Sequence, residues 1–192
     1  MTQPEDVLDF WFGDAHGIDP RWFRGGESFD DEIRERFGEE VEAALDGGFD
    51  DWESTARHRL ALILLLDQFT RNLFRSTPRM YAGDERAFRL SRWGIEQGMD
   101  LELVPRERAF FYLPLEHAED LDAQLVSVER FERLATDAGE DKAEMAAGFL
   151  DYAKRHAEVV RRFGRFPHRN VIFGRETTAE ERAFLDSDAA PF

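Results

Sequence analysis

Apolar residues recur at helical spacing over nearly the whole chain. In the segment SFDDEIRERFGEEVEAALDGG, the residues Phe29, Ile33, Phe37, Val41 and Leu45 follow one another at intervals of four. Residues at this spacing lie on one face of an α-helix, whereas a half-buried strand requires alternation of apolar and polar residues. No stretch alternates for long enough to predict a sheet. The sequence therefore indicates an all-α fold.

Short turns that carry glycine, proline, aspartate or serine separate the predicted helices. Seven or eight antiparallel helices with such short connections form an array of helical hairpins. Pro105 suits the first turn of a helix, and Pro114 is expected to kink or interrupt that helix. The expected helices span about 2–12, 28–47, 55–74, 84–97, 105 onward, 119–136, 140–163 and 178–185.

Residues that favour helix ends stand at several of these boundaries. Thr2 and Glu5 match a capping box, and Ser28 and Asp84 are candidate N-caps of later helices. Gly164 is expected to end the helix over 140–163 in a left-handed conformation.

Length and composition predict one domain over residues 1–192, with a short frayed tail from about residue 186. A hydrophobic content of 42%, including 18 phenylalanines, is sufficient for a sizeable core. The absence of cysteine excludes disulfides, thiolate metal sites and a cysteine nucleophile.

Charge and hydropathy narrow the expected compartment and partners. The N-terminus lacks the pattern of a signal peptide, and the longest apolar run, LALILLL, is too short to span a bilayer. We therefore expect a cytoplasmic protein. A net charge of −16 opposes binding to nucleic acid or to an anionic membrane. Residues 1–52 carry a net charge of −12, whereas residues 53–118 carry +1, so the arginines of the central region have fewer acidic neighbours in sequence.

Two predicted helices are apolar on every side and lead directly into polar residues. LALILLL is followed by DQFTRNLFR, and AFFYLPL is followed by EH. A helix that is apolar all round is buried, so the polar groups at its end must pair with one another, meet water or bind a ligand. A third polar segment, GRFPHRN, begins at Gly164 and contains guanidinium and imidazole donors that suit a phosphate or a carboxylate.

The sequence thus predicts a pocket at which these three segments meet. His156 is added because it shares a helical stripe with Phe149, Tyr152 and Val160 and should point inward. The candidate ligand-binding residues are Arg71, Asn72, Arg75, His117, His156, Arg165, His168, Arg169 and Asn170, and a supporting polar network comprises Asp67, Gln68, Glu116 and Asp120.

Each of these features also has a purely structural interpretation. Asp67 and Arg71 can form an ordinary ion pair across one helical turn, and His156 can be a core histidine bonded to a backbone carbonyl. No pair of histidines stands at metal-ligand spacing, so no metal site is expected. The sequence contains no nucleophile elbow, Walker loop or dinucleotide fingerprint, and no cofactor is predicted.

Three blocks of the sequence resemble the bacterial family called domain of unknown function 924. They are DQFTRNLFRSTPRMYAGD, FFYLPLEHAEDL and RFGRFPHRNVIFGRETTAEE, and the resemblance extends from VLDFWFG to EERAFL. It implies a tetratricopeptide-like fold, a right-handed superhelix of helical hairpins, and it implies no activity, cofactor or substrate. The family pattern usually has proline at the position of Thr70, so the resemblance alone does not settle whether the helix is kinked there.

Three functions remain open at this point. The first is a binding module whose concave side holds a peptide or a small anionic ligand. The second is a metal-independent hydrolase in which a histidine beside a carboxylate acts as the general base. In the third, the polar motifs only hold the helices together. The sequence does not predict an oligomeric state.

Overall fold

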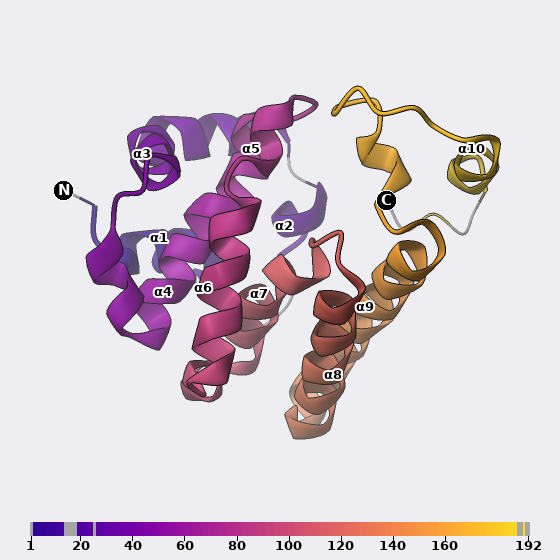
Figure 1. Ribbon diagram of the computed structural model, residues 1–192. Coiled ribbons are helices and arrows are strands. Elements are labelled where there is room, and N and C mark those ends of the chain that lie inside the picture. Colours follow the sequence, from indigo (N-terminus) through magenta and orange to yellow (C-terminus); the bar gives the residue numbers. More distant parts are fainter. Residues whose placement is uncertain (1, 14–18, 25, 188–189, 191–192) are drawn as a thin grey trace. The chain divides into compact units, whose positions relative to one another are not determined.

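The structure is a computed structural model that describes residues 2–13, 19–24, 26–187 and 190 (Figure 1). Within these residues the chain forms helices and no strand, which confirms the all-α prediction. Most of the predicted frayed tail lies outside the described residues. The α-helices are α1 (Pro4–Phe12), α2 (Arg21–Arg24), α3 (Glu27–Leu45), α4 (Ala56–Ile63), α5 (Thr70–Leu73), α6 (Asp84–Glu96), α7 (Pro105–Glu116), α8 (Leu121–Asp137), α9 (Ala143–Phe163) and α10 (Ala179–Leu185). The 3-10 helices are η1 (Asp50–Ser54), η3 (Pro78–Tyr81), η4 (Met99–Glu102), η5 (Glu140–Lys142) and η6 (Pro167–Arg169), and η2 (Leu64–Phe69) is a π-helix.

The chain divides into two compact units. The first comprises Met1–Pro114 and the second Leu115–Phe192, so α7 contributes residues to both. Each unit has its own buried residues and is described below by itself. A single domain over 1–192 stays a prediction.

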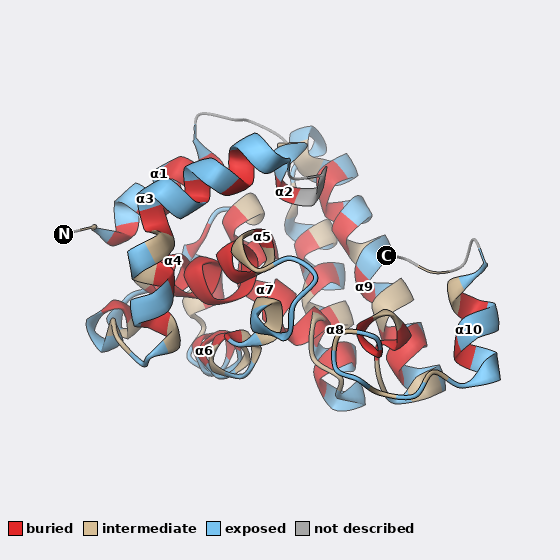
Figure 2. Ribbon diagram, turned by 90° about the horizontal axis from the view of Figure 1, so that it is seen from above, coloured by how far each residue is buried: buried red, intermediate tan, exposed pale blue. Residues whose placement is uncertain are grey.

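The predicted all-apolar helix is the centre of the first unit. Every residue from Leu60 to Leu66 is at most 1% exposed, and the ribbon beside the label α4 is mostly red in Figure 2. By contrast, α3 has one buried face and one exposed face in the same view. This difference follows from the sequence, because α3 alternates apolar and charged residues at helical spacing whereas α4 runs into an unbroken apolar stretch.

Aromatic rings from α1, η2 and α7 pack on this central helix. The ring centroids of Trp11 and Phe69 are 5.4 Å apart, and those of Trp11 and Phe110 are 5.6 Å apart in an edge-to-face arrangement. The indole of Trp22 donates a hydrogen bond of 2.8 Å to the Trp11 carbonyl. Each such aromatic pair adds about 0.5–1.5 kcal/mol beyond its buried area.

The helix predicted over 55–74 is confirmed in its extent, but its middle is not α-helical. Residues Leu64–Phe69 form a π-helical segment, η2, between α4 and α5. The wider turn removes carbonyl groups from the regular α-helical hydrogen-bond pattern. Side chains that follow in the same helix donate hydrogen bonds to these carbonyls. Thr70 Oγ1 donates to the Leu66 carbonyl at 2.8 Å, and Arg71 Nη1 donates to the Asp67 carbonyl at 2.6 Å. The motif that follows the apolar stretch thus satisfies its own backbone.

The start of α6 approaches this π-helical segment very closely. Gly83 is the residue before α6, and a Cβ atom built on it would lie 2.2 Å from the carbonyl oxygen of Leu66. The Gly83 backbone has φ −90° and ψ −8°, which any residue can adopt. Glycine is therefore required here by the contact with Leu66 and not by the dihedral angles.

The second unit contains an antiparallel hairpin of α8 and α9, which lie side by side in Figures 1 and 2. The rings of Phe131 and Phe149 stack across the hairpin with centroids 5.8 Å apart. Gly164 ends α9 with φ +68°, which confirms the predicted left-handed cap. Beyond it, Val160, Phe166 and Phe184 form a buried cluster that joins α9 to η6 and α10.

Three predicted boundaries are wrong. Pro114 does not interrupt α7, which continues to Glu116, and Ser91 Oγ donates to the Phe111 carbonyl at 2.5 Å and so helps to satisfy the backbone beside the proline. The helix expected to begin at Ser28 begins at Glu27, with Gly26 as its N-cap. Thr2 donates to Glu40 and does not cap α1.

Two further expectations need correction. Gln3 is the N-cap of α1, where it forms the capping box with Asp6 that was assigned to Thr2 and Glu5. Tyr152 is 49% exposed, so it does not belong to the buried stripe of α9. Phe149, by contrast, is 5% exposed, as that stripe requires.

Candidate functional site

The predicted pocket residues divide between the two units. Arg71, Asn72 and Arg75 belong to the first unit, together with Asp67 and Gln68 of the supporting network. The remaining residues belong to the second unit. Convergence of all three segments on one ligand stays a prediction, and each group is described separately.

In the first unit, Arg71 is held between two carboxylates. Its Nη1 lies 3.1 Å from Asp67 Oδ1 and 2.9 Å from Asp84 Oδ1, and its Nη2 donates to Asp84 Oδ2 at 3.1 Å. Gln68 donates its amide to Asp67, which is fully buried. Burial alone would lower the pKa of Arg71, but the charges of Asp67 and Asp84 outweigh it and raise that pKa. The guanidinium therefore stays charged and fixed.

Asn72 and Arg75 share a third carboxylate. Asn72 Nδ2 donates to Asp30 Oδ1 at 2.7 Å, and Arg75 binds the same carboxylate through Nε at 2.6 Å and Nη2 at 3.0 Å. Burial alone would raise the pKa of Asp30, and these hydrogen bonds lower it. The geometry thus favours the structural interpretation for the three candidate residues of this unit, because α5 is tied to α3 and α6 through them.

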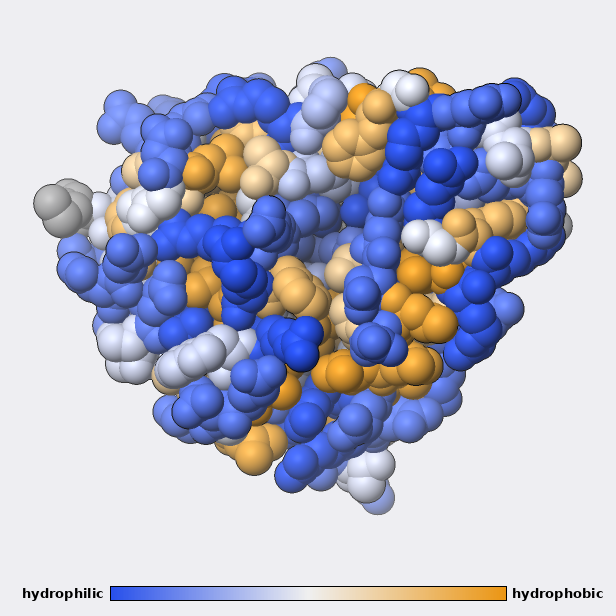
Figure 3. All heavy atoms as spheres, viewed as in Figure 1, coloured by the Kyte–Doolittle hydropathy of each residue, from blue (hydrophilic) through white to orange (hydrophobic). Residues whose placement is uncertain are grey.

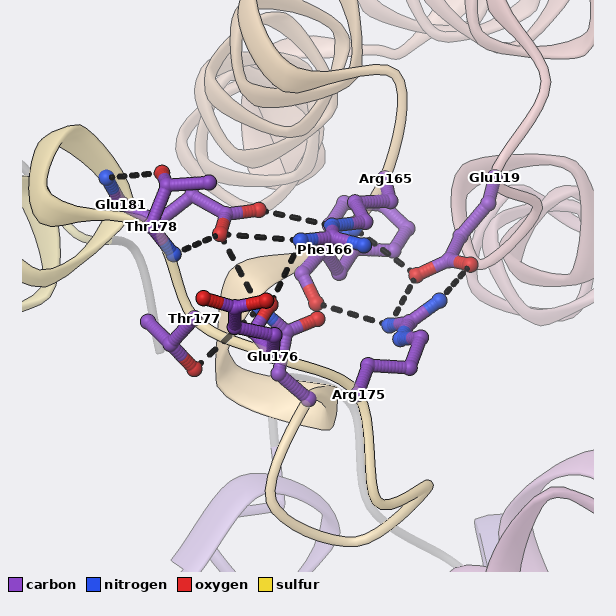
Figure 4. A network of polar contacts seen from close by, with 9 residues as sticks. Glu119, Arg165, Phe166, Arg175, Glu176, Thr177, Thr178 and Glu181 are labelled. Carbon is purple, nitrogen blue, oxygen red and sulfur yellow. Dashed lines mark hydrogen bonds and ion pairs between the residues drawn. The ribbon is translucent and has the colours of Figure 1, made fainter.

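In the second unit, Arg165 and Asn170 are bound by one glutamate at the start of α10 (Figure 4). Arg165 donates to Glu181 through Nε at 2.7 Å and Nη2 at 3.0 Å, and Asn170 Nδ2 lies 3.3 Å from Glu181 Oε2. Glu181 also forms a capping box with Thr178. The Arg165 hydrogen bonds lower the pKa of Glu181 to about 2. These two candidate residues hold the chain end in place.

Figure 4 also shows an ion pair between Arg175 and Glu119. The sequence analysis did not select Arg175. Arg175 binds Glu119 through Nη1 at 2.6 Å and Nη2 at 2.8 Å, and the backbone N–H of Phe166 donates to the same carboxylate at 2.8 Å. Arg175 lies in the block RFGRFPHRNVIFGRETTAEE, one of the three that resemble the family. Membership of this block was the sequence feature that could have identified Arg175. The Glu119 carboxylate, oriented by Arg175, thus holds the backbone of Phe166 in place.

Phe166 is the centre around which the remaining candidates gather. Its ring is fully buried, with the imidazole of His156 at 5.5 Å and that of His168 at 5.8 Å between ring centroids. The guanidinium carbon of Arg169 lies 4.6 Å from the Phe166 ring centroid, and Arg169 is 6% exposed. The turn after Pro167 thus brings His168 and Arg169 next to His156 of α9.

His156 is oriented by its backbone and by a buried carboxylate. Its Nδ1 lies 2.9 Å from the Tyr152 carbonyl and 3.4 Å from Glu116 Oε1, and its side chain is 12% exposed. These acceptors assign the proton of the neutral ring to Nδ1. Burial lowers the pKa of His156 to about 4, and the nearby positive charges of His117, Arg169 and Arg155 act in the same direction.

His168 is subject to the same effects. Burial lowers its pKa to about 3, and Arg169, His156 and His117 add to the shift while Glu119 opposes it. At neutral pH both imidazoles are therefore uncharged, and they lie in a positive field to which Arg169 contributes.

The end of α7 and the start of α8 form the polar border of this cluster. Asp120, placed in the supporting network by the sequence, is the N-cap of α8 and accepts from the Ala123 N–H at 2.8 Å. Gln124, which the sequence analysis did not select, donates to the Glu116 carbonyl at 2.5 Å and the Ala118 carbonyl at 2.8 Å. The oxygens Gln124 Oε1 and Ser127 Oγ are buried without a hydrogen-bond partner. Such atoms are expected where a water or a ligand completes the site.

We expect the protein to lose stability in mild acid because of these histidines. In the unfolded chain they take up protons near pH 6.5, whereas in the folded state His156 does so near pH 4 and His168 near pH 3. The unfolded state thus binds more protons between these values, so the free energy of unfolding falls as the pH decreases below 6.5. Urea unfolding at pH 7.5, 6.0 and 5.0 measures this fall.

The variant His168→Gln provides the control, because it removes one of the two groups. Its stability should decrease less than that of the wild type between pH 6.5 and 5. Identical pH profiles for the two proteins would show that His168 is not held neutral by its surroundings.

Neither metal ligands nor membrane spans are evident in the described part of the chain. There, no three histidine, aspartate or glutamate side chains are grouped so that they could hold a metal ion. No helix among the described residues combines the length and the apolar character needed to cross a membrane.

A family model and a solved structure both match nearly the whole chain, and both are described as proteins of unknown function. A family model described as "Bacterial protein of unknown function (DUF924)" matches residues 7–189. A solved structure of a protein of unknown function from Agrobacterium tumefaciens is similar over 95% of this chain and 96% of its own, with 40% sequence identity and a TM-score of 0.84. No curated protein matches the chain. Both matches extend over the two units and name no ligand.

Proposed function

The chain belongs to the DUF924 family of bacterial proteins, as its motifs predict, and from this premise we propose that it is a binding module for a small anion. The proposed site is the cluster of His156, His168 and Arg169 around Phe166, together with His117, which interacts electrostatically with both imidazoles. In this proposal the helices form a tetratricopeptide-like array of hairpins that supports the site, and the protein works in the cytoplasm.

The observation that carries the proposal is the arrangement of three donor groups on one buried ring. His156, His168 and Arg169 come from α9 and from the turn after it, and all three lie against Phe166. Burial is the main cause of the lowered pKa of both histidines, and the positive charges that add to this effect would also stabilise an anion. Arg169 would supply charge-assisted hydrogen bonds, and the imidazoles would supply neutral N–H groups.

A small anion suits this cluster better than an extended peptide does. The groups that would bind it are few, and Arg169 is 6% exposed. A peptide would need a row of accessible contacts along a groove, whereas a phosphate or a short carboxylate needs only a few convergent donors.

One observation favours a hydrolase as the second candidate. Glu116 lies 3.4 Å from His156 Nδ1, which is the arrangement of a carboxylate that orients a general base. The pKa of His156, lowered to about 4, makes its Nε2 a weak base at neutral pH. Efficient base catalysis requires a pKa closer to the working pH, so the geometry supports anion binding better.

The test is a titration of the full-length protein with inorganic phosphate, followed by NMR of the histidine rings. We expect the pKa values of His156 and His168 to rise when phosphate binds, because the anion stabilises the protonated rings. At one hundred times its dissociation constant, phosphate should stabilise the folded state by about 2.7 kcal/mol and so raise the melting temperature.

Two variants make the test specific. Arg169→Gln should abolish both effects of phosphate, whereas Arg161→Gln should retain them because Arg161 is exposed and pairs only with Glu158 on its own helix. If Arg169→Gln fails to fold, the pKa change at His168 in the wild type still decides. Unchanged histidine pKa values at saturating phosphate would contradict the proposal. Hydrolysis of p-nitrophenyl acetate that is lost in His156→Gln would favour the hydrolase.

A further inference from the structure

The first unit contains a groove that none of the sequence motifs indicated. Its volume is about 560 Å³, within the range of small-molecule sites. The groove lies along α6 and is bordered by residues of η1 and α4, among them Glu53, Arg59, Arg86, Leu90, Arg92 and Trp93. The region over α6 carries mainly hydrophilic residues with hydrophobic ones between them (Figure 3).

Trp93 provides an exposed aromatic surface in this groove. It is 46% exposed, whereas Trp11, Trp22 and Trp52 are at most 9% exposed. The guanidinium carbon of Arg59 lies 4.4 Å from the centroid of the Trp93 ring. Leaving a large aromatic side chain in water forgoes the stabilisation of burial, so a tryptophan beside a cation in a groove is a candidate binding surface.

Arg59 is buried, and its ion-pair partner among the described residues is a distant one. It is 4% exposed, its Nη1 lies 3.4 Å from the Leu90 carbonyl, and its Nη2 donates to the Glu53 carbonyl. The nearest carboxylate oxygen in an ion pair with it, Glu53 Oε2, is 3.9 Å away, and its buried Nε has no hydrogen-bond partner in the described part of the chain. Burial therefore lowers the pKa of Arg59 despite the charge of Glu53. An anion in the groove would supply the missing negative charge.

The position of Arg59 depends on a glycine of α6. A Cβ atom on Gly94 would lie 3.1 Å from Arg59 Cδ and 2.5 Å from Phe111 Cζ. Any larger residue at this position would displace both side chains. The helix thus provides the space in which Arg59 extends below Trp93, so the cation is built into the wall of the groove.

The charges of the groove are opposite in sign to those of the whole protein. Four arginines and two glutamates line it, in a chain of net charge −16. Arg92 is the most exposed of these arginines and pairs only across one helical turn, with Glu96 at 3.2 Å. Such an exposed pair is weak and can be exchanged for a ligand carboxylate.

From these observations we propose that the groove along α6 binds an aromatic carboxylate. The carboxylate is held by the positive charge of Arg59 and Arg92, and the aromatic ring packs against Trp93. This site lies in the first unit, and it is independent of the anion site proposed in the second unit.

The experiment compares three probes on the full-length protein: benzoate, its neutral analogue benzamide, and inorganic phosphate. Binding is followed by the NMR signal of the Trp93 indole N–H, assigned with the variant Trp93→Phe. We expect benzoate to shift this signal in a saturable manner. Benzamide and phosphate should bind at least about tenfold more weakly, because each lacks one of the two groups that the groove recognises.

Variants at exposed positions keep the test separate from folding. Arg92→Gln should weaken benzoate binding by about tenfold, the effect of losing a charge-assisted contact. Arg133→Gln is the matched control, since the Arg133 side chain is also exposed, at 52% against 65% for Arg92, and forms the same one-turn pair with Asp137 on α8; it should bind benzoate like the wild type. The proposal is overturned if benzoate causes no saturable shift, if benzamide binds equally well, or if Arg92→Gln retains wild-type affinity.

Discussion

Replacing Gly83 by alanine should destabilise the protein by about 3 kcal/mol or more, at the upper end of the usual range for overpacking. The added Cβ atom would lie 2.2 Å from the Leu66 carbonyl oxygen, which is backbone in the buried π-helical segment and cannot move aside as a side chain can. Two other effects are smaller. Loss of glycine flexibility in the unfolded chain would favour alanine by about 0.4–1 kcal/mol, and replacing the glycine N-cap by alanine would cost roughly 0.5–1 kcal/mol.

Gly148→Ala is the control for this prediction. Gly148 lies within α9, and a Cβ atom there would meet nothing within 4 Å. Alanine should stabilise the protein at this position by about 0.5–1 kcal/mol, the usual advantage over glycine inside a helix. Both variants are measured by urea unfolding. Equal stability of Gly83→Ala and the wild type would mean that α6 does not approach the π-helical segment as closely as described.

Phe166→Ala should have the second large effect, a loss of about 3–5 kcal/mol for a fully buried phenylalanine. The ring packs with Val160 and Phe184 in the core of the second unit. It also separates His156, His168 and Arg169. Without the ring, water can reach both imidazoles, so their pKa values should rise from about 4 and about 3 towards 6.5.

The neighbouring variant Phe163→Ala distinguishes the two consequences. Phe163 is only partly buried and packs against Phe184, with ring centroids 5.2 Å apart. Its replacement should lower stability less and leave the histidine pKa values in place. Urea unfolding and NMR titration of both variants provide the two measurements. If Phe166→Ala left the pKa values of His156 and His168 unchanged, another feature would be responsible for holding these rings neutral.

The two proposed sites differ in how far the sequence pointed to them. His168 and Arg169 were selected because a helix ends at Gly164 and a proline follows, which forces a turn and exposes polar groups that need partners. His156 was selected because it shares a helical stripe with apolar residues. Arg59 and Trp93 were not selected, because they are 34 positions apart and neither stands in an unusual pattern. Only the packing of α4 against α6 brings the guanidinium beside the indole.

The π-helical segment shows that local sequence patterns can predict a helix correctly without revealing a change in its helical period. The spacing of apolar residues from Leu60 to Leu66 indicated burial, and burial was confirmed. The wider turn at Leu64–Phe69 has no apolar signature, since a fully apolar stretch looks the same at any helical period. Thr70 and Arg71 stabilise it through local hydrogen bonds, whereas the close approach of Gly83 and the pairing of Arg71 with Asp84 depend on the position of α6.

What the sequence determined by itself was the all-α class, the buried central helix, most helix ends and the family. The first three follow from interactions between residues a few positions apart, whose periodicity and capping chemistry can be read directly. The family was indicated by the resemblance of three sequence blocks. The tertiary structure decided which polar residues bind one another. Arg71, Arg75 and Arg165 were all candidates for a ligand, and only the fold assigned Asp84, Asp30 and Glu181 to them. An arginine pairs with whichever carboxylate packing brings within about 3 Å, and packing between distant segments leaves no mark on local spacing.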